Sequence, residues 1–335
     1  IIIINNNLYE INVFYFLVLS NVKNLMWVEK YRPENITQII NQKSIIDRLR
    51  PFLKTPNAIP HLLFTGPPGT GKTTLAIILA KNILGKNWQE YSIFLNSSDE
   101  RGINTVRQRI KNFARYADNR EKVPFKMIIL DEADEMTNDA QTALRRIMEE
   151  TSKSSRFILI GNYISNIIQP IQSRCSIFHF IKLEQKYITT QLETIASKEK
   201  IKYDNQSMKM IYEISNGDLR AAINLLQSSS TSGKLDIKNI NKAYNLSHKK
   251  QIIDIINLAI NKKFSEAREK LITLNNVYGV SEKDFLKFAN EEIMKNKNEN
   301  IEEIIKILAK YDYRIIQGAN PEIQLSALLA EIAAI

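Results

Sequence analysis

An eight-residue glycine-rich segment constrains the fold of this chain more than any other feature. The segment Gly66-Pro67-Pro68-Gly69-Thr70-Gly71-Lys72-Thr73 matches the pattern G-x4-G-K-[ST]. It lies between the apolar run 62–64 and a helical pattern that opens at Thr73-Thr74-Leu75-Ala76. A strand, such a loop and a helix in that order form a P-loop, in which backbone N–H groups and the helix N-terminus surround phosphate oxygens. The sequence therefore predicts a nucleotide phosphate site. A plain Gly/Pro turn is the alternative.

Two side chains of this loop have expected roles in nucleotide chemistry. Lys72 would reach β- and γ-phosphate oxygens, because a P-loop lysine neutralises the charge there. Thr73 would ligate Mg²⁺ through its hydroxyl. The predicted ligands are therefore a nucleotide with a γ-phosphate and Mg²⁺; the family resemblance described below implies that the nucleotide is ATP.

An acidic segment behind the P-loop supplies the second half of the predicted site. Asp131 directly follows the apolar run 127–130, so it lies at the end of a predicted strand and is suited to holding Mg²⁺ through water. Glu132 is the candidate to polarise the attacking water. We interpret Asp134 and Glu135 as solvated or structural residues.

Apolar runs that alternate with helical patterns predict an α/β domain in the first half of the chain. Four short runs fit strands buried in a parallel sheet, at residues 62–64, 93–95, 127–130 and 157–160. From about residue 183 the strand signals end and helical periodicity takes over. In the last third, helices are expected at 250–260, 264–275, 281–296, 301–317 and 321–334.

The first 25 residues need a separate interpretation. Their apolar run, residues 13–19, is too short for a membrane helix, which takes about 20 residues. A secretory signal would have a basic segment before the run, and none is present. We interpret residues 1–25 as a non-native or disordered extension, with function starting near Met26. A flexible tail or a weak anchor is the alternative. The remaining chain has no run long enough to span a membrane.

Composition excludes several kinds of site and points to one kind of partner. A single cysteine, Cys175, excludes a disulfide framework and a cysteine-built zinc site, and three histidines argue against a histidine-rich metal centre. The formal net charge is +10. Residues 26–180 hold 22 basic against 15 acidic residues, which suggests a polyanionic partner for this part.

A basic stretch between residues 101 and 126 is the candidate contact with that polyanion. Arg107, Lys111 and Arg115 are spaced four residues apart and share one helix face. From the residues alone, a solvated helix face is the more frequent explanation. The basic residues of the stretch are Arg101, Arg107, Arg109, Lys111, Arg115, Arg120, Lys122 and Lys126.

Several motifs, in order, closely resemble the small subunits of replication factor C, a family of AAA+ clamp loaders. The resemblance extends from Met26 to the end of the chain. A generic AAA+ protein would share the P-loop and Asp131-Glu132, but not the segments Tyr31-Arg32-Pro33 or Asp99–Gly102. The motifs are Trp27-Val28-Glu29-Lys30-Tyr31-Arg32-Pro33, the P-loop, Asn96-Ser97-Ser98-Asp99-Glu100-Arg101-Gly102-Ile103, Asp131-Glu132-Ala133-Asp134, Ala143-Leu144-Arg145-Arg146, Ser173-Arg174-Cys175, Gly217-Asp218-Leu219-Arg220 and Gly318-Ala319-Asn320.

The resemblance implies both an architecture and an activity. Residues 26–182 would form the AAA+ nucleotide-binding domain, residues 183–238 a helical lid, and residues 239–335 an all-α collar for oligomerisation. ATP binding and hydrolysis, weak in an isolated subunit, would drive the opening of a sliding clamp and its loading onto primer–template DNA in replication and repair. The partners would be large and small subunits in a pentamer, the clamp, and DNA contacted through its phosphates.

Two other functions stay open at this point. The chain could be a nucleotide-binding scaffold subunit with little turnover, or another DNA-remodelling AAA+ ATPase. The expected location is the nucleus for a eukaryotic source, and the cytoplasm for an archaeal source or a viral replication site.

The resemblance also implies roles for residues on which spacing alone is silent. Asn162 is similar to sensor 1, Arg220 to sensor 2, and Arg174 to an arginine finger that acts on the ATP of a neighbouring subunit. A surface ion pair for Arg174 and a helix-capping salt bridge for Arg220 are the alternatives. The expected nucleotide contacts are Val28, Arg32, Gly66, Pro67, Pro68, Gly69, Thr70, Gly71, Lys72, Thr73, Thr74, Asn162 and Arg220.

For the basic stretch, the resemblance favours DNA binding over a solvated face. Arg101, Arg107, Lys111 and Arg115 would follow the DNA backbone without reading its sequence. The chain departs from the family pattern at a few positions. One of them is Gly161, which stands where the family often has a cysteine beside the sensor asparagine.

Overall fold

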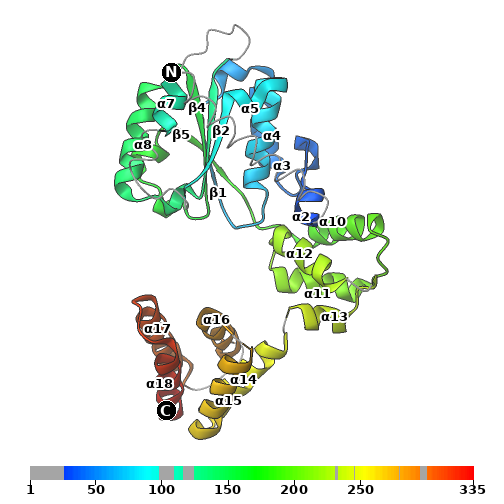
Figure 1. The fold of residues 1–335 in the computed structure, drawn as a ribbon, viewed down its shortest axis with the longest axis vertical. Helices are drawn as coiled ribbons and strands as arrows, with labels where there is room; N and C mark the ends of the chain where they lie inside the picture. Colours follow the sequence, from blue (N-terminus) through cyan, green and yellow to red (C-terminus); the bar gives the residue numbers. More distant parts are fainter. Residues whose placement is uncertain are drawn as a thin grey trace, which may run out of the picture. The chain divides into compact units, whose positions relative to one another are not determined.

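Five parallel strands in the computed structural model form one sheet, in the order β2-β3-β4-β1-β5 (Figure 1). The structure describes residues 26–97, 109–115, 124–230, 233–244, 246–278, 280–294 and 300–335. The strands are β1 His61–Thr65, β2 Ser92–Asn96, β3 Lys126–Asp131, β4 Ser155–Gly161 and β5 Cys175–His179. The first four contain the apolar runs seen in the sequence.

The strand β5 was not predicted from the sequence. It pairs with β1 on one side only and forms an edge of the sheet, so three of its five residues are only partly buried. Only Phe178 of β5 is buried, so this strand lacks the continuous apolar run that marks the other four. Because β5 runs parallel to β1, the residue that follows it, Phe180, lies beside the start of the P-loop. The Phe180 N–H donates to the Thr65 carbonyl oxygen at 2.7 Å.

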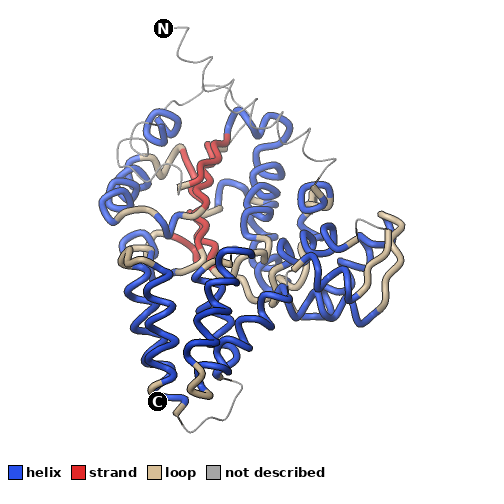
Figure 2. The backbone as a smooth tube through the Cα atoms, turned by 60° about the horizontal axis from the view of Figure 1, so that its bottom comes forward, coloured by secondary structure: helices blue, strands red, loops and turns tan. Residues whose placement is uncertain are grey.

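Helices cover both faces of the sheet (Figures 1 and 2). Side chains of β1 alternate between the two cores: Leu62 and Phe64 join one cluster and Leu63 joins the other. This is the two-residue period of a strand buried on both faces. The first cluster is completed by α3 Lys43–Lys54, α4 Lys72–Leu84 and α5 Trp88–Tyr91, and the second by α7 Lys111–Arg115, α8 Asn138–Glu150 and α9 Gln169–Gln172.

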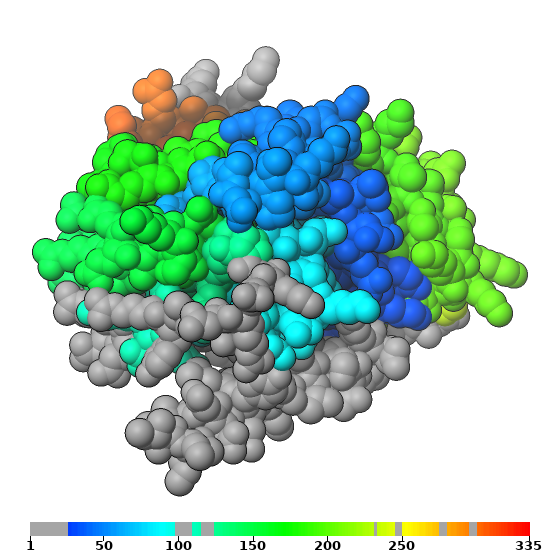
Figure 3. All heavy atoms as spheres, turned by 90° about the horizontal axis from the view of Figure 1, so that it is seen from above, coloured from blue at the N-terminus to red at the C-terminus, as the bar shows by residue number. Residues whose placement is uncertain are grey.

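Three further helices form the predicted lid. They are α10 Gln185–Lys198, α11 Asn205–Ser215 and α12 Leu219–Ser229. Asp218 caps α12, because its Oδ1 accepts the Ala221 N–H at 3.0 Å. The short helix α2 Trp27–Lys30 lies against α12, and the space-filling view has the residues after Met26 (blue) packed on the lid (yellow-green) (Figure 3).

The chain divides into two compact units, one up to Asp236 and one from Ile237 to Ile335. The second unit is entirely helical within its described residues. Its core includes Ile255, Leu271, Phe285 and Leu328. Its helices are α13 Ile237–Ala243, α14 Leu246–Ile260, α15 Phe264–Tyr278, α16 Glu282–Ile293, α17 Ile301–Ile316 and α18 Pro321–Ala333.

These elements confirm the predicted fold class, an α/β domain followed by helical lid and C-terminal parts. The finer boundaries at 25, 182 and 238 stay predictions. In the described part of the chain, no helix has the length and hydropathy needed to cross a bilayer.

Candidate nucleotide-binding site

At Gly66 and Gly69, among other P-loop positions, the backbone takes a course that only glycine permits. Gly66 has φ +133° and Gly69 has φ +67°, both in the region that L side chains avoid. A Cβ on Gly66 would lie 2.2 Å from the Phe180 carbonyl oxygen, and one on Gly69 would lie 1.8 Å from Asp218 Oδ1. The loop is therefore packed between the end of β5 and the lid.

Lys72, the first residue of α4, has its ammonium group inside this loop. Its Nζ donates to the carbonyl oxygens of Gly66 at 2.6 Å and Pro67 at 2.8 Å, and to Asn162 Oδ1 at 3.0 Å. The side chain is buried. Burial lowers the pKa of Lys72 from 10.5 to about 8, and the nearby Asp131 carboxylate limits the shift.

This lowered pKa predicts that nucleotide binding is coupled to a proton. Bound phosphates favour the ammonium form, so the pKa of Lys72 should rise on binding. At pH 8 binding is therefore expected to take up about half a proton, and affinity should fall as the pH rises from 7 to 9. Calorimetric titration of ADP in buffers of different ionisation enthalpy measures this uptake. A binding enthalpy at pH 8 that is the same in every buffer would mean that no proton is taken up, and would contradict the prediction.

The predicted metal-binding pair lies together beside the P-loop. Thr73 Oγ1 donates to Asp131 Oδ2 at 2.7 Å, and Asp131 Oδ1 accepts the N–H of Glu132 at 3.0 Å. Glu132 itself has φ +54°, an uncommon conformation for a residue with a side chain. Such backbone strain is typical of active sites.

Asn162 follows β4 and joins the same constellation through its contact with Lys72. The carboxylate behind it is Asp134, which is 6% exposed and accepts two backbone N–H groups of the chain after β4. Of the two earlier interpretations of Asp134, the structural one is correct. Glu135 is exposed.

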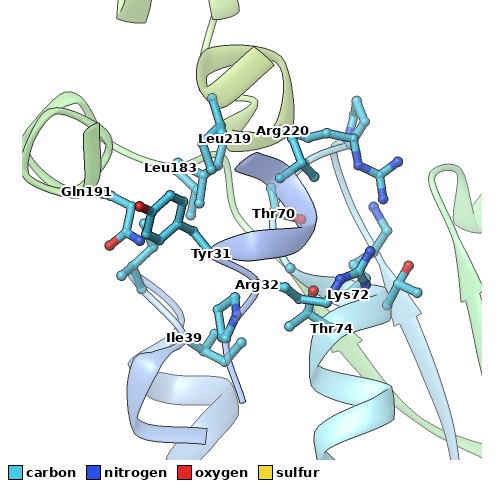
Figure 4. Close-up of a pocket in the computed structure, with 18 of the residues that line it drawn as sticks. Tyr31, Arg32, Ile39, Thr70, Lys72, Thr74, Leu183, Gln191, Leu219 and Arg220 are labelled. Atoms are coloured by element: carbon cyan, nitrogen blue, oxygen red, sulfur yellow. The ribbon is translucent and has the colours of Figure 1, made fainter. Parts of the chain in front are cut away.

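A cavity of about 230 Å³ extends from the P-loop to the lid. Arg220 and Lys72 lie on one side of it, and Tyr31, Leu183 and Gln191 on the other (Figure 4). The cavity is lined by Val28, Tyr31, Arg32, Pro33, Gln38, Ile39, Ile40, Pro68, Gly69, Thr70, Gly71, Lys72, Thr73, Thr74, Asp131, Glu132, Asn162, Leu183, Gln191, Leu219, Arg220 and Ile223. The structure thus gathers most of the predicted nucleotide contacts around one space.

The segment that carries Tyr31 is fastened to the lid by polar contacts. Tyr31 Oη and Lys30 Nζ each donate to Glu199 Oε1 at 2.6 Å, and the Trp27 N–H donates to Gln227 Oε1 at 2.9 Å. Burial and the bond to the Glu199 carboxylate raise the pKa of Tyr31. Sequence reasoning missed Glu199 and Gln227, because nothing local marks a contact that spans 168 to 200 residues.

Arg32, predicted to contact the nucleotide, lines the cavity but is also held by a neighbour. Its Nε donates to Glu29 Oε2 at 2.9 Å, and its Nη2 donates to Glu29 Oε1. The Arg32 guanidinium therefore lines the cavity while it is ion-paired with Glu29.

Arg174 lies outside the cavity. Its Nη2 is 2.5 Å from Glu149 Oε1, and its Nη1 donates to the Pro170 carbonyl oxygen at 2.7 Å. The side chain is 37% exposed. The surface ion pair is therefore present, and the finger role stays a prediction about a neighbouring subunit.

Two of the four predicted DNA-binding residues, Arg101 and Arg107, lie outside the described residues. Lys111 and Arg115 are the first and last residues of α7. Lys126, from the same basic stretch, is engaged internally: its Nζ donates to the Phe113 carbonyl oxygen at 3.1 Å. DNA binding by this helix stays a prediction.

Comparison with protein-family models and solved structures defines the class. The family of ATPases associated with various cellular activities (AAA) matches residues 62–183, and the RCF1/5-like AAA+ ATPase lid domain matches residues 190–231. The Thermotoga maritima RuvB Holliday junction branch migration motor has a similar fold, with a TM-score of 0.53 and 17% identity over 76% of this chain and 84% of that chain. Fold and site together define an AAA+ ATPase, as predicted.

The remaining comparisons identify the family. The replication factor C C-terminal domain matches residues 247–331. The replication factor C small subunit of Saccharolobus solfataricus is 46% identical over 318 residues, 94% of this chain and 96% of the relative. That of Sulfurisphaera tokodaii is 46% identical over 320 residues, 94% of this chain and 97% of the relative. The chain belongs to the replication factor C small subunit family.

Proposed function

We propose that this chain is a small subunit of a clamp loader, in which ATP binding between neighbouring subunits holds a ring-shaped clamp open for loading onto primer–template DNA. One observation carries the proposal. The cavity gathers Lys72, Glu132 and Arg220, whereas Arg174 stays on the surface of the same unit. The arginine expected to act as the finger is not among the residues that line its own cavity, and the exposed arginine of a neighbouring subunit could supply that group instead.

The cofactor is ATP with Mg²⁺. The hydroxyl of Thr73 and the carboxylate of Asp131 are 2.7 Å apart and supply hard oxygen ligands. Mg²⁺ in such sites keeps several waters and takes further oxygens from the phosphates. This fits a chain in which no described group of three His, Cys, Asp or Glu residues could hold an ion alone. Thr73 and Asp131 would hold the ion, and its charge would offset the negative charge that develops on the phosphates.

The partners are large and small clamp-loader subunits in a pentamer, the sliding clamp, and DNA. The helices from residue 239 onward would serve as the collar between subunits, residues 183–238 as the lid and residues 26–182 as the ATPase domain. Lys111 and Arg115 would contact DNA phosphates, together with Arg101 and Arg107. The relatives named above are archaeal, which favours the cytoplasm among the expected locations.

The test is clamp loading by the complex that co-purifies with a tagged form of this chain. We expect the complex to retain labelled clamp on primer–template DNA with ATP, and Lys72→Ala to abolish loading because the phosphates lose their central cation. Unchanged loading by Lys72→Ala would favour the scaffold function instead. Strand movement without a clamp would favour another DNA-remodelling motor.

A further inference from the structure

A buried carboxylate lies directly behind the sensor asparagine. Asp134 belongs to the short 3₁₀ turn η5, Ala133–Glu135, and its Oδ2 accepts the backbone N–H groups of Asn162 at 2.9 Å and Tyr163 at 3.0 Å. A buried carboxylate is stable only when it is hydrogen-bonded. These two bonds therefore hold the chain after β4 at a fixed position relative to the Asp131-Glu132 segment.

The contact reaches the nucleotide site through one residue. The backbone N–H of Asn162 donates to Asp134, and its side-chain Oδ1 accepts from Lys72 Nζ at 3.0 Å. Only two side-chain torsions separate the anchored backbone from that amide group. We propose that Asp134 is a positioning residue for ATP hydrolysis, acting through the backbone of Asn162 to hold the sensor amide beside Lys72.

The two oxygens of this carboxylate differ in their surroundings. Oδ2 accepts both backbone N–H groups, whereas Oδ1 is buried and has no hydrogen-bond partner among the described residues. The hold on the chain after β4 therefore runs through Oδ2.

Gly161 supplies the space for the carboxylate. A Cβ on Gly161 would lie 2.8 Å from Asp134 Oδ1 and 2.9 Å from its Cγ, closer than real Cβ contacts. The backbone of Gly161 would accept a side chain, because its φ is not positive. The absence of a side chain at position 161 therefore matters for where Asp134 lies. It gives a second way to move the carboxylate without removing it.

The inference rests on the proposed sensor role of Asn162, and its test needs neither DNA nor clamp. Basal ATP hydrolysis is measured for the complex of the tagged full-length chain, after subtraction of the rate of the Lys72→Ala complex. Asp134→Ala should lower kcat about 10–100-fold, because a displacement near 1 Å in a positioned group can cost 10²-fold. ADP affinity should change less than about threefold, since ADP has no γ-phosphate for the sensor to contact.

Further variants separate positioning from folding. Asp134→Asn keeps a carbonyl oxygen for the two N–H groups and should retain most of the rate. Gly161→Ala crowds Asp134 Oδ1 without removing the carboxylate, so it should lower kcat in the same direction but by a smaller factor, because the end of a side chain can shift. It also provides a test if Asp134→Ala fails to fold. Glu135→Ala, at the exposed neighbour on the same turn, should leave the rate unchanged.

A double-mutant cycle decides whether Asp134 acts through Asn162. In an Asn162→Ala background, Asp134→Ala and Gly161→Ala should each add little further loss. If either variant lowers kcat by the same factor in the Asn162→Ala background as in the wild-type chain, the proposal is overturned. An ADP affinity that falls by the same factor as kcat would also overturn it. A failure of clamp loading would leave this outcome untouched.

Discussion

Replacing Arg174 by alanine is expected to lower ATP hydrolysis by the assembled complex by about 10³–10⁵-fold at each site that this chain completes, the range found for arginine fingers in GTPases. The side chain lies outside its own cavity and is 37% exposed, so reaching a neighbour's γ-phosphate requires that its surface contacts with Glu149 and Pro170 open. Nucleotide affinity of the altered chain should stay the same, because its own P-loop is intact. Steady-state hydrolysis and ADP titration of the purified complex measure the two quantities.

A variant of the ion-pair partner distinguishes the finger from a structural salt bridge. Glu149→Gln removes the carboxylate that holds Arg174 but leaves the guanidinium available. Exposed ion pairs contribute only about 0–1 kcal/mol, so this change should leave hydrolysis nearly unaffected. Equal losses from Glu149→Gln and Arg174→Ala would mean that the ion pair itself matters and that no finger role is needed.

Replacing Glu132 by glutamine should lower hydrolysis about 10²–10⁴-fold, the usual contribution of a positioned general base. Glu132 lines the cavity one residue after Asp131, and its own N–H donates to Asp131 Oδ1, which orients the segment. Glutamine has nearly the same shape but no charge to polarise water. ATP affinity should therefore be kept or rise slightly, and single-turnover hydrolysis measures the loss.

The matched control for this variant lies on the same turn. Glu135→Gln removes one charge from an exposed position three residues away and should keep the wild-type rate. Loss of activity in both variants would point to the local charge rather than to a base. An unaffected Glu132→Gln complex would remove Glu132 from the mechanism.

The P-loop, four of the five strands and the acidic segment could be predicted from sequence because their signals are local. A buried strand has a continuous apolar run. The P-loop that carries Lys72 follows the run in β1, and Asp131 directly follows the run in β3. β5 escaped prediction because only Phe178 of its five residues is buried, so it has no continuous apolar run, whereas β2, at the other edge of the sheet, keeps one.

Other parts of the site depend on tertiary structure that spacing does not encode. Asp134 was assigned no function from sequence, since its burial arises only when η5 packs behind β4. Glu199 contacts Tyr31 across 168 residues. Lys126 belongs to a basic stretch by charge, yet its ammonium binds the Phe113 carbonyl oxygen near the end of α7. Charge patterning alone does not distinguish such an internal contact from a DNA contact.

ATP turnover at a site shared between subunits is expected to respond to DNA and clamp. The most direct measurement is the ATP hydrolysis rate of the complex that co-purifies with the tagged chain, alone, with primer–template DNA, and with DNA plus clamp. We predict strong stimulation by DNA and clamp together, and its loss in the Arg174→Ala complex. A rate indifferent to the clamp would contradict this account.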